Sequence, residues 1–398
     1  MKTATRSSAR DVFVTFLRLG LTSFGGPVAH FGYFRDELVA RRRWLDERTF
    51  ADMVALSQFL PGPASSQVGI AVGAARAGLP GALAAWLGFT LPSALALVLF
   101  AVAVGRFPGG VAAGWLDGLK VVAVAVVARA VWSMARTLCP DRPRATLAVL
   151  AAIAVVAWPG APGQIAAIAL GGLAGWAFLP SETGDAPSSL HRTVGRRTAI
   201  AFLALFFALL VALPITAGLI DGLPLRLADG FYRSGALVFG GGHVILPLLQ
   251  AEVVPPGWIT KDGFLAGYGA AQAVPGPLLS FAAYLGATID PRWGGWPAGL
   301  LCLVAAFLPS FLLVLGVLPF WDALRRRAAV QSAMRGVNAA VVGLLLAALY
   351  DPVWTSAIES APDFALAVVA FALLALWKLP PWLVVALSAV VGALLATS

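Results

Sequence analysis

Long apolar runs, separated by short polar loops, set the pattern of this chain. The runs occur at residues 79–104, 111–134, 198–220, 295–318, 337–350 and 383–396. A helix needs about 20 apolar residues to cross the hydrocarbon core of a bilayer, and lipid cannot pair with the free backbone groups of any other structure. The pattern therefore predicts an all-α polytopic membrane protein that is embedded in a lipid bilayer.

One stretch of sequence occurs twice along the chain. Residues 16–26 resemble 231–241, residues 44–50 resemble 258–264, and residues 58–63 resemble 272–277. Paired hydrophobic halves that are interrupted by Gly and Pro at matching positions are typical of secondary transporters, which bind their substrate between the halves. We expect an N-terminal repeat at 11–180, a linker at 181–197, and a segment at 198–397 that holds a connecting helix and a C-terminal repeat, whose core starts at about residue 228.

Equivalent loops of the two halves carry opposite charge patterns. Residues 35–48 include five arginines, whereas the counterpart at 250–261 has one basic residue. Residues 325–335 include four arginines, whereas the counterpart in the first half has only Arg106 before Lys120. Because loops rich in Lys and Arg stay in the cytoplasm, the two repeats are predicted to have inverted topology, with the linker on the cytoplasmic side.

Each half also contains a hydrophobic segment that is broken by glycine and proline. Pro61-Gly62-Pro63 divides residues 49–76 into two pieces of about a dozen residues, each about half a bilayer long at roughly 1.5 Å per residue. We interpret this segment as a re-entrant helix pair whose turn lies at mid-depth. The segment around Gly25 is predicted to be broken as well; in the alternative it spans the membrane fully and the N-terminus lies outside.

The broken points are candidate anion-binding elements. Backbone groups freed by a break need new partners, and a helix that restarts after Pro63 or Pro277 presents its partially positive N-terminus there. The predicted substrate site consists of Phe24, Gly25, Gly26, Gln58, Pro61, Gly62, Pro63, Ser65, Ser66, Gly240, Gly241, His243, Gln272, Pro275, Gly276, Pro277 and Ser280. In the alternative, the turns are packed kinks, the glycines only allow close helix packing, and His243 is a hydrogen-bonded core residue rather than a proton carrier.

Two arginines are repeat partners inside largely apolar segments. Arg18 and Arg233 occupy equivalent positions, and a charge within the membrane is costly unless it has a function or reaches the interface. We include both in the predicted substrate site because an arginine attracts anions. The alternative is that each side chain extends to a nearby interface.

Composition and missing motifs exclude other classes of function. The chain is 60% hydrophobic and 12% charged, and its net charge of +9 comes largely from arginines at the ends of apolar spans, which argues against nucleic acid as a partner. Cys139 and Cys302 are not spaced as a metal-binding pair. The sequence has no phosphate-binding loop, zinc-protease motif or serine-hydrolase motif, so we expect no enzyme activity, no cofactor, no metal, and a cargo that moves on existing gradients.

The chain resembles the chromate ion transporter (CHR) family in its bidomain form. The resemblance rests on the Phe24-Gly25-Gly26-Pro27 motif, the stretches 44–50 and 58–63, and their counterparts in the second half. The resemblance covers nearly the whole chain. It implies a transporter of the bacterial plasma (inner) membrane that exports chromate, a tetrahedral dianion, and confers chromate resistance. Gly242 stands where the first copy has proline, so we expect the halves to contribute unequally. Sulfate as the cargo, a passive anion channel, proton exchange and a homodimer are alternatives or additions that the sequence leaves open.

Overall fold

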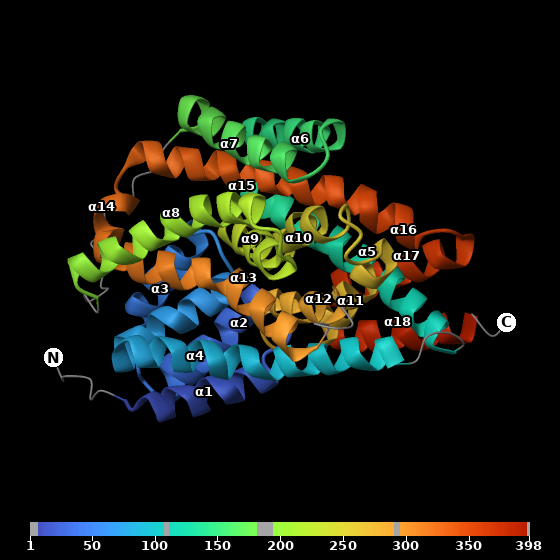
Figure 1. Cartoon of the computed structure of the whole chain (residues 1–398), viewed down its shortest axis with the longest axis horizontal. Coiled ribbons are helices and arrows are strands. Elements are labelled where there is room, and N and C mark those ends of the chain that lie inside the picture. Colours follow the sequence, from blue (N-terminus) through green and yellow to red (C-terminus); the bar gives the residue numbers. More distant parts are fainter. Residues whose placement is uncertain (1–6, 107–110, 181–193, 290–294, 396–398) are drawn as a thin grey trace.

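The computed structural model describes residues 7–106, 111–180, 194–289 and 295–395, and all regular elements in these ranges are helices (Figure 1). The first half contains α1 (Ala9–Thr22), α2 (Pro27–Phe34), η1 (Arg35–Arg41), α3 (Glu47–Phe59), α4 (Ala64–Arg106), α5 (Val111–Leu138), α6 (Arg142–Ala157) and α7 (Ala161–Phe178). Helix α8 (Arg196–Leu219) then leads to the second half. Most of the predicted linker, residues 181–193, lies outside the described residues.

The second half repeats the same order of helices. It contains α9 (Leu223–Ala236), η2 (Gly242–Val244), α10 (Ile245–Val253), α11 (Lys261–Ala273), η3 (Leu278–Ser280), α12 (Phe281–Ile289), α13 (Trp296–Val317), η4 (Leu318–Phe320), α14 (Trp321–Arg325), α15 (Ala328–Ala348), η5 (Leu349–Trp354), α16 (Thr355–Ala357), α17 (Ala361–Ala375) and α18 (Pro381–Leu395). The order of the helices and the duplicated motifs show which helices are equivalent. Helices α1, α2 and α3 match α9, α10 and α11, and the long α4 matches α12 and α13 together. Helix α5 matches α15, and the pair α6 and α7 matches the pair α17 and α18.

The two halves interlock. Helix α5 of the first half lies against α17 and α18 of the second, and α15 of the second half lies against α6 and α7 of the first (Figure 1). Glycines bring these helices close together. A Cβ atom on Gly118 in α5 would overlap the backbone of Ser388 in α18, and one on Gly336 in α15 would overlap the backbone of Gly171 in α7.

Within the described residues, six helical segments are long and apolar enough to cross a membrane. They are Ala64–Gly105, Gly114–Leu138, Ala161–Phe178, Arg196–Leu219, Trp296–Arg325 and Ala328–Ala357. These segments confirm the predicted all-α polytopic class. The apolar runs in the sequence did not single out α6, α7 or α17, because these helices are short and glycines interrupt the hydrophobic pattern of α7.

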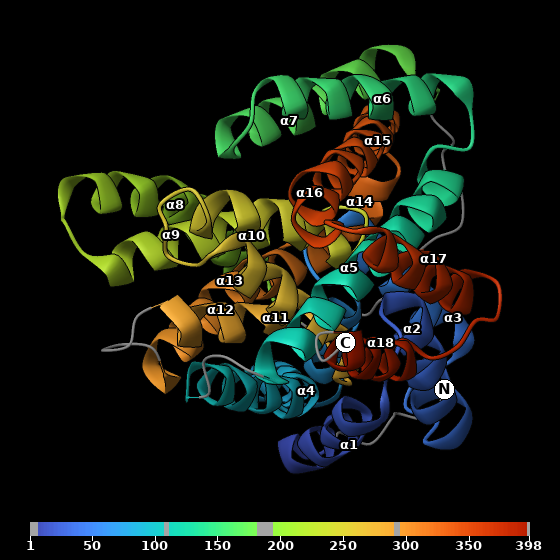
Figure 2. The same cartoon turned by 90° about the vertical axis from the view of Figure 1, so that its right-hand side faces the viewer.

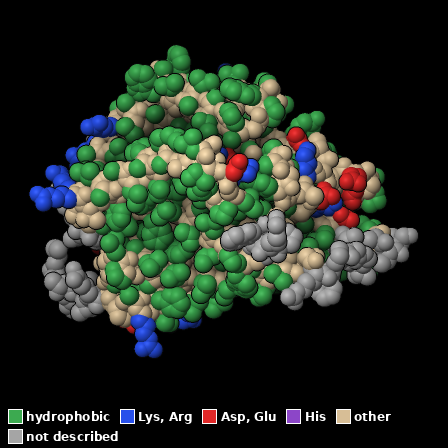
Figure 3. Space-filling model, in the orientation of Figure 1, with side chains coloured by type: hydrophobic (Ala, Val, Ile, Leu, Met, Phe, Trp, Pro, Cys, Tyr) green, Lys and Arg blue, Asp and Glu red, His purple; other side chains and the backbone are tan. Residues whose placement is uncertain are grey.

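The surface has an apolar face between charged ends. In Figure 3 hydrophobic side chains cover most of the visible face, with Lys and Arg mainly at one end and Asp and Glu mainly toward the other. Large apolar side chains on α8, among them Phe207 and Val211, are exposed. Such a surface is costly in water and suited to contact with lipid chains.

The predicted breaks in the hydrophobic segments are present. Helix α1 ends at Thr22 and α2 begins at Pro27, while α3 ends at Phe59 and α4 begins at Ala64. Helix α4 has a second break at Gly78, where the backbone is left-handed with φ of 66°. Both sides of the Pro-Gly-Pro turn are therefore short helices, while their re-entrant placement in a membrane stays a prediction.

Two ion pairs lie near opposite ends of the protein; the pair Asp52–Arg325 joins the two halves, whereas the pair Lys261–Asp351 lies within the second half. Asp52 in α3 pairs with Arg325 in α14 at 3.2 Å, near the end where α3 and α14 lie in Figure 1. Lys261 at the start of α11 pairs with Asp351 in η5 at 3.2 Å, near the opposite end. The Asp52–Arg325 pair brings the arginine-rich segments 35–48 and 325–335 to the same end of the protein, which agrees with inverted orientation of the two repeats.

Candidate functional site

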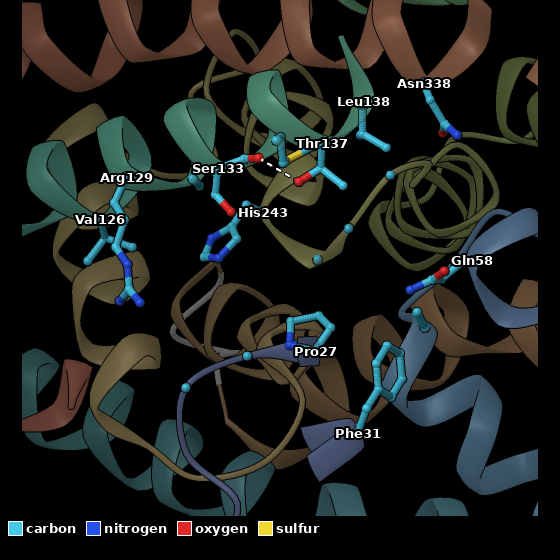
Figure 4. A pocket seen from close by; sticks show the side chains of 18 of the residues that line it. Pro27, Phe31, Gln58, Val126, Arg129, Ser133, Thr137, Leu138, His243 and Asn338 are labelled. Atoms are coloured by element: carbon cyan, nitrogen blue, oxygen red, sulfur yellow. Dashed lines mark hydrogen bonds between the residues drawn. The ribbon is translucent and has the colours of Figure 1, made fainter. Parts of the chain in front are cut away.

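A cavity of about 510 Å³ lies where the glycine-rich segments of the two repeats meet (Figure 4). Many of the sequence-predicted residues line it, namely Gly25, Gly26, Gln58, Gly62, Gly240, Gly241, His243 and Gln272. Further lining comes from α2, α5, α15 and the start of α18. The structure thus brings the equivalent broken segments of both halves to one place.

The paired glycine motifs form backbone walls of the cavity. Gly25 and Gly26 have φ of 97° and 81°, and Gly240 and Gly241 have φ of 72° and 143°. These left-handed or extended positive-φ conformations favour glycine, because a side chain would strain the backbone. Gly26 directly precedes the first turn of α2, so backbone N–H groups without an intrahelical partner lie beside the cavity.

The two Pro-Gly-Pro turns are held by the glycine motifs of the opposite half. The Gly62 N–H donates to the Val238 carbonyl at 2.6 Å, and the Gly276 N–H donates to the Ser23 carbonyl at 2.9 Å. Val238 and Ser23 directly precede the two Phe-Gly-Gly motifs and are themselves equivalent in the repeat. These reciprocal hydrogen bonds fix each broken helix against the other repeat at the centre of the protein.

Two glutamines supply amide groups from equivalent helix ends. Gln58 lies near the end of α3 and Gln272 near the end of α11, and both line the cavity. Figure 4 shows Gln58 among the side chains that line the cavity. The Nε2 group of Gln272 is buried and has no hydrogen-bond partner among the described residues. A buried donor without a partner is costly, so a bound acceptor would satisfy it.

A polar stripe on α5 gives the cavity its positive charge. Arg129, Ser133 and Thr137 follow each other at intervals of four residues and therefore share one helix face, which lines the cavity (Figure 4). Arg129 is half-buried and is the only Lys, Arg, Asp or Glu side chain among the described lining residues. No ion pair to a carboxylate is formed by Arg129 within the described part of the chain.

His243 lies on the same side of the cavity as Arg129. It is the middle residue of η2, and its Nδ1 atom shares a hydrogen bond of 2.8 Å with the Tyr268 hydroxyl in α11. Figure 4 shows the imidazole ring and the Arg129 guanidinium extending into the cavity. The hydrogen bond to Tyr268 holds the imidazole ring in place beside the cation.

Other sequence-predicted site residues support the cavity without lining it. Ser65, Ser66 and Ser280 are buried in the core, and the Ser280 hydroxyl hydrogen-bonds that of Ser93 at 2.7 Å. Phe24 packs against Trp382 with ring centroids 6.2 Å apart. Five further residues shape the two breaks but do not line the cavity. They are Pro61, Pro63, Pro275, Gly276 and Pro277.

The two repeat-partner arginines lie elsewhere. Arg18 is exposed on α1 and does not line the cavity. Arg233 is held by Glu252 and Asp229, with nitrogen–oxygen distances of 2.9 and 3.0 Å. The positive charge at the cavity therefore comes from Arg129, which has no equivalent in the second half.

The repeated motifs do not reveal Arg129, because the second half has no equivalent arginine. Counting from the equivalent pair Gly118 and Gly336, the position of Arg129 corresponds to Ala347. Arg129 also lies within the apolar run 111–134, which was interpreted only as a membrane span. The available signal was an arginine deep in an apolar run, followed by hydroxyl residues on the same helix face.

Comparison with known proteins gives a consistent result for both halves. The model of the chromate transporter family matches residues 10–176 and 225–393. A chromate transport protein of Pseudomonas aeruginosa is 29% identical over 379 residues, covering 91% of this chain and 85% of that protein. A chromate transport protein of Cupriavidus metallidurans is 28% identical over 400 residues, covering 98% of this chain and 94% of that protein. No solved structure matches. Because both repeats match over most of their length, the chain belongs to the chromate transporter family.

Proposed function

We propose that this protein is a secondary transporter that exports chromate across the bacterial plasma membrane and binds it in the cavity between the two repeats. The observation that carries the proposal is Arg129, a half-buried cation without a carboxylate partner in the described residues, at a cavity that both halves form. Membership of the chromate transporter family and the names of the relatives support chromate as the substrate.

The chemistry of the cavity suits a tetrahedral oxyanion. Arg129 offers one positive charge with several N–H donors, and Gln272 and Gln58 offer neutral amide donors. The glycine motifs add backbone N–H groups at helix starts, where anions are favoured. None of the described lining residues is an Asp or Glu, so the cavity contains no charge that would repel an anion.

Export is the favoured direction on energetic grounds. Moving one charge through 100 mV is worth about 2.3 kcal/mol, so expelling a dianion from a negative interior gains roughly 4.6 kcal/mol. At 1.4 kcal/mol per decade this sustains about a thousandfold gradient without any coupled ion. Import would face the same free energy with the opposite sign.

Arg129→Gln tests whether the cavity is the substrate site. Loss of a charge-assisted hydrogen bond costs about 1.5–3 kcal/mol, so chromate flux at low concentration should fall roughly tenfold to a hundredfold in purified protein in liposomes. The matched control is Arg136→Gln, on the same helix but outside the cavity lining, which should transport like the wild type. Equal flux in the two variants would place the substrate elsewhere.

The same assay separates chromate from sulfate, which has the same charge and shape. Radiolabelled sulfate is offered alone and in excess over chromate. We expect chromate to be carried and sulfate to compete weakly. Sulfate carried as fast as chromate would make the protein a general oxyanion permease, and flux that never saturates would indicate a passive channel.

A further inference from the structure

A second buried polar cluster lies between α9 and α10, two helices that are neighbours in Figure 2, and none of its residues lines the anion cavity. Arg233 in α9 binds Glu252 in α10 through two hydrogen bonds, Nε to Oε1 at 3.2 Å and Nη2 to Oε2 at 2.9 Å. The same Nη2 atom lies 3.0 Å from Asp229 Oδ2. Two carboxylates therefore share one guanidinium nitrogen.

The cluster is enclosed and short of neutralising charge. The side chains of Asp229 and Glu252 are each only 13% exposed. Helices α7 and α13, which pack against α10 and α9, contain no Lys, Arg, His, Asp or Glu. Two other elements that pack against α10 contain one such residue each: Arg335 in α15, whose Nη1 donates to the Pro180 carbonyl, and His243 in η2, which hydrogen-bonds Tyr268 beside the anion cavity. In α8, the other helix packed against α9, the only charged residues are Arg196 and Arg197 at its distant first turn. With both carboxylates ionised the cluster has a net charge of −1, and burial disfavours that state.

A buried acceptor beside the cluster lacks a hydrogen-bond donor. Gln164 in α7 is 4% exposed and donates its Nε2 to the Pro247 carbonyl at 3.0 Å, while its Oε1 has no partner among the described residues. Gln164 and Glu252 line the same small cavity, of about 10 Å³, which is the size of one water molecule. An ionised carboxylate has no hydrogen to donate to Oε1, whereas a protonated carboxyl group or a water molecule has one.

The equivalent position of the first half is built differently. Glu252 corresponds to Glu37, which pairs with Arg41 at 2.9 Å and with Arg42 at 2.7 Å. Asp229 corresponds to Val14, which has no charge. The first half thus surrounds its single carboxylate with cations, and only the second half has an excess carboxylate.

We propose that Asp229, Arg233 and Glu252 form a proton-binding site that takes up and releases one proton in each transport cycle. The inference rests on the proposed transport function and adds a coupled ion to it. Protonation of one carboxyl group brings the cluster to zero net charge and lets the cluster, directly or through one water molecule, donate to Gln164. Release of the proton restores the negative charge between α9 and α10.

The test measures chromate and protons together in liposomes that contain purified protein and an entrapped pH-sensitive dye. In the wild type, chromate flux should be accompanied by a change in luminal pH. Asp229→Asn and Glu252→Gln each hold the cluster at zero charge, so the pH change per chromate should fall roughly tenfold or more. Chromate-for-chromate exchange, which needs no net proton movement, should persist. The control is Asp221→Asn, whose carboxylate is fully exposed before α9 and which should behave like the wild type.

The outcomes separate the two proposals. A wild-type protein that moves no chromate would overturn the transport function itself. Chromate flux without any pH change in the wild type, or an unchanged pH change per chromate in both variants, would overturn only the proton site. Loss of chromate exchange in variants that stay monodisperse would also overturn it, because the cluster would then be needed for chromate translocation itself rather than for proton coupling.

Discussion

At the scale of single residues, the charge of the site comes from a position that the repeat does not duplicate. The sequence predicted the glycines, the glutamines and His243, and the structure places all of them except Gly276 around one cavity. It also suggested Arg18 and Arg233, which the structure places away from that cavity. Repetition identifies the glycine and proline breaks that both halves contain. A single bound substrate needs only one arginine to pair with its charge, and that arginine, Arg129, occurs in one half only.

Backbone conformation at Gly241 gives a prediction at the same scale. Gly241 has φ of 143° and ψ of 162°, a region that only glycine adopts readily, although a Cβ atom there would meet no other atom within 4 Å. Gly241→Ala should therefore cost about 1–3 kcal/mol through backbone strain alone and shift the N–H groups beside the cavity. We expect a lower melting temperature in detergent and weaker chromate transport.

Gly242→Ala is the matched control for this substitution. Gly242 lies next in the chain without positive φ, and its added Cβ would meet Leu278 at an ordinary 3.7 Å. This variant should melt much like the wild type. If the two variants had the same melting temperature, strain at Gly241 would not be what requires glycine there.

At the scale of elements, hydrophobic pattern and turn chemistry predicted the helices but not their partners. The turns at Pro61-Gly62-Pro63 and Pro275-Gly276-Pro277 were visible in the sequence because proline removes a backbone donor. The crossing of each turn to the other half, through the Gly62 and Gly276 hydrogen bonds, was not visible. Pairing between distant segments depends on shape and register, which a local pattern does not encode.

Close packing between α5 and α18 gives the prediction at this scale. An added Cβ at Gly118 would overlap the Ser388 carbonyl, which is rigid backbone. Gly118→Ala should destabilise the protein by about 1–3 kcal/mol because the helices must move apart. The control is Gly218→Ala in α8, where an added Cβ meets nothing within 4 Å. Thermal unfolding in detergent should give a clearly lower midpoint only for the first variant, and equal midpoints would contradict the interlocked packing.

At the scale of the whole molecule, duplication and inversion generate a cavity that both halves close. Reciprocal helix packing and reciprocal hydrogen bonds at Gly62 and Gly276 place the broken segments around one centre. The charge pattern of the loops predicted inverted orientation, and the pair Asp52–Arg325 joins α3, which follows the arginine-rich segment 35–48, to α14, where the arginine-rich segment 325–335 begins. A cavity between two such halves is suited to opening toward either side of the membrane in turn.

The most direct measurement of the central claim is chromate uptake into inside-out membrane vesicles that contain this protein, under imposed potentials of both signs. The lumen of these vesicles corresponds to the exterior of the cell. With the lumen positive, a dianion gains roughly 4.6 kcal/mol per 100 mV, so chromate should accumulate strongly. With the lumen negative, accumulation should be abolished. Absence of chromate accumulation at both polarities would contradict the account of an anion exporter driven by membrane potential.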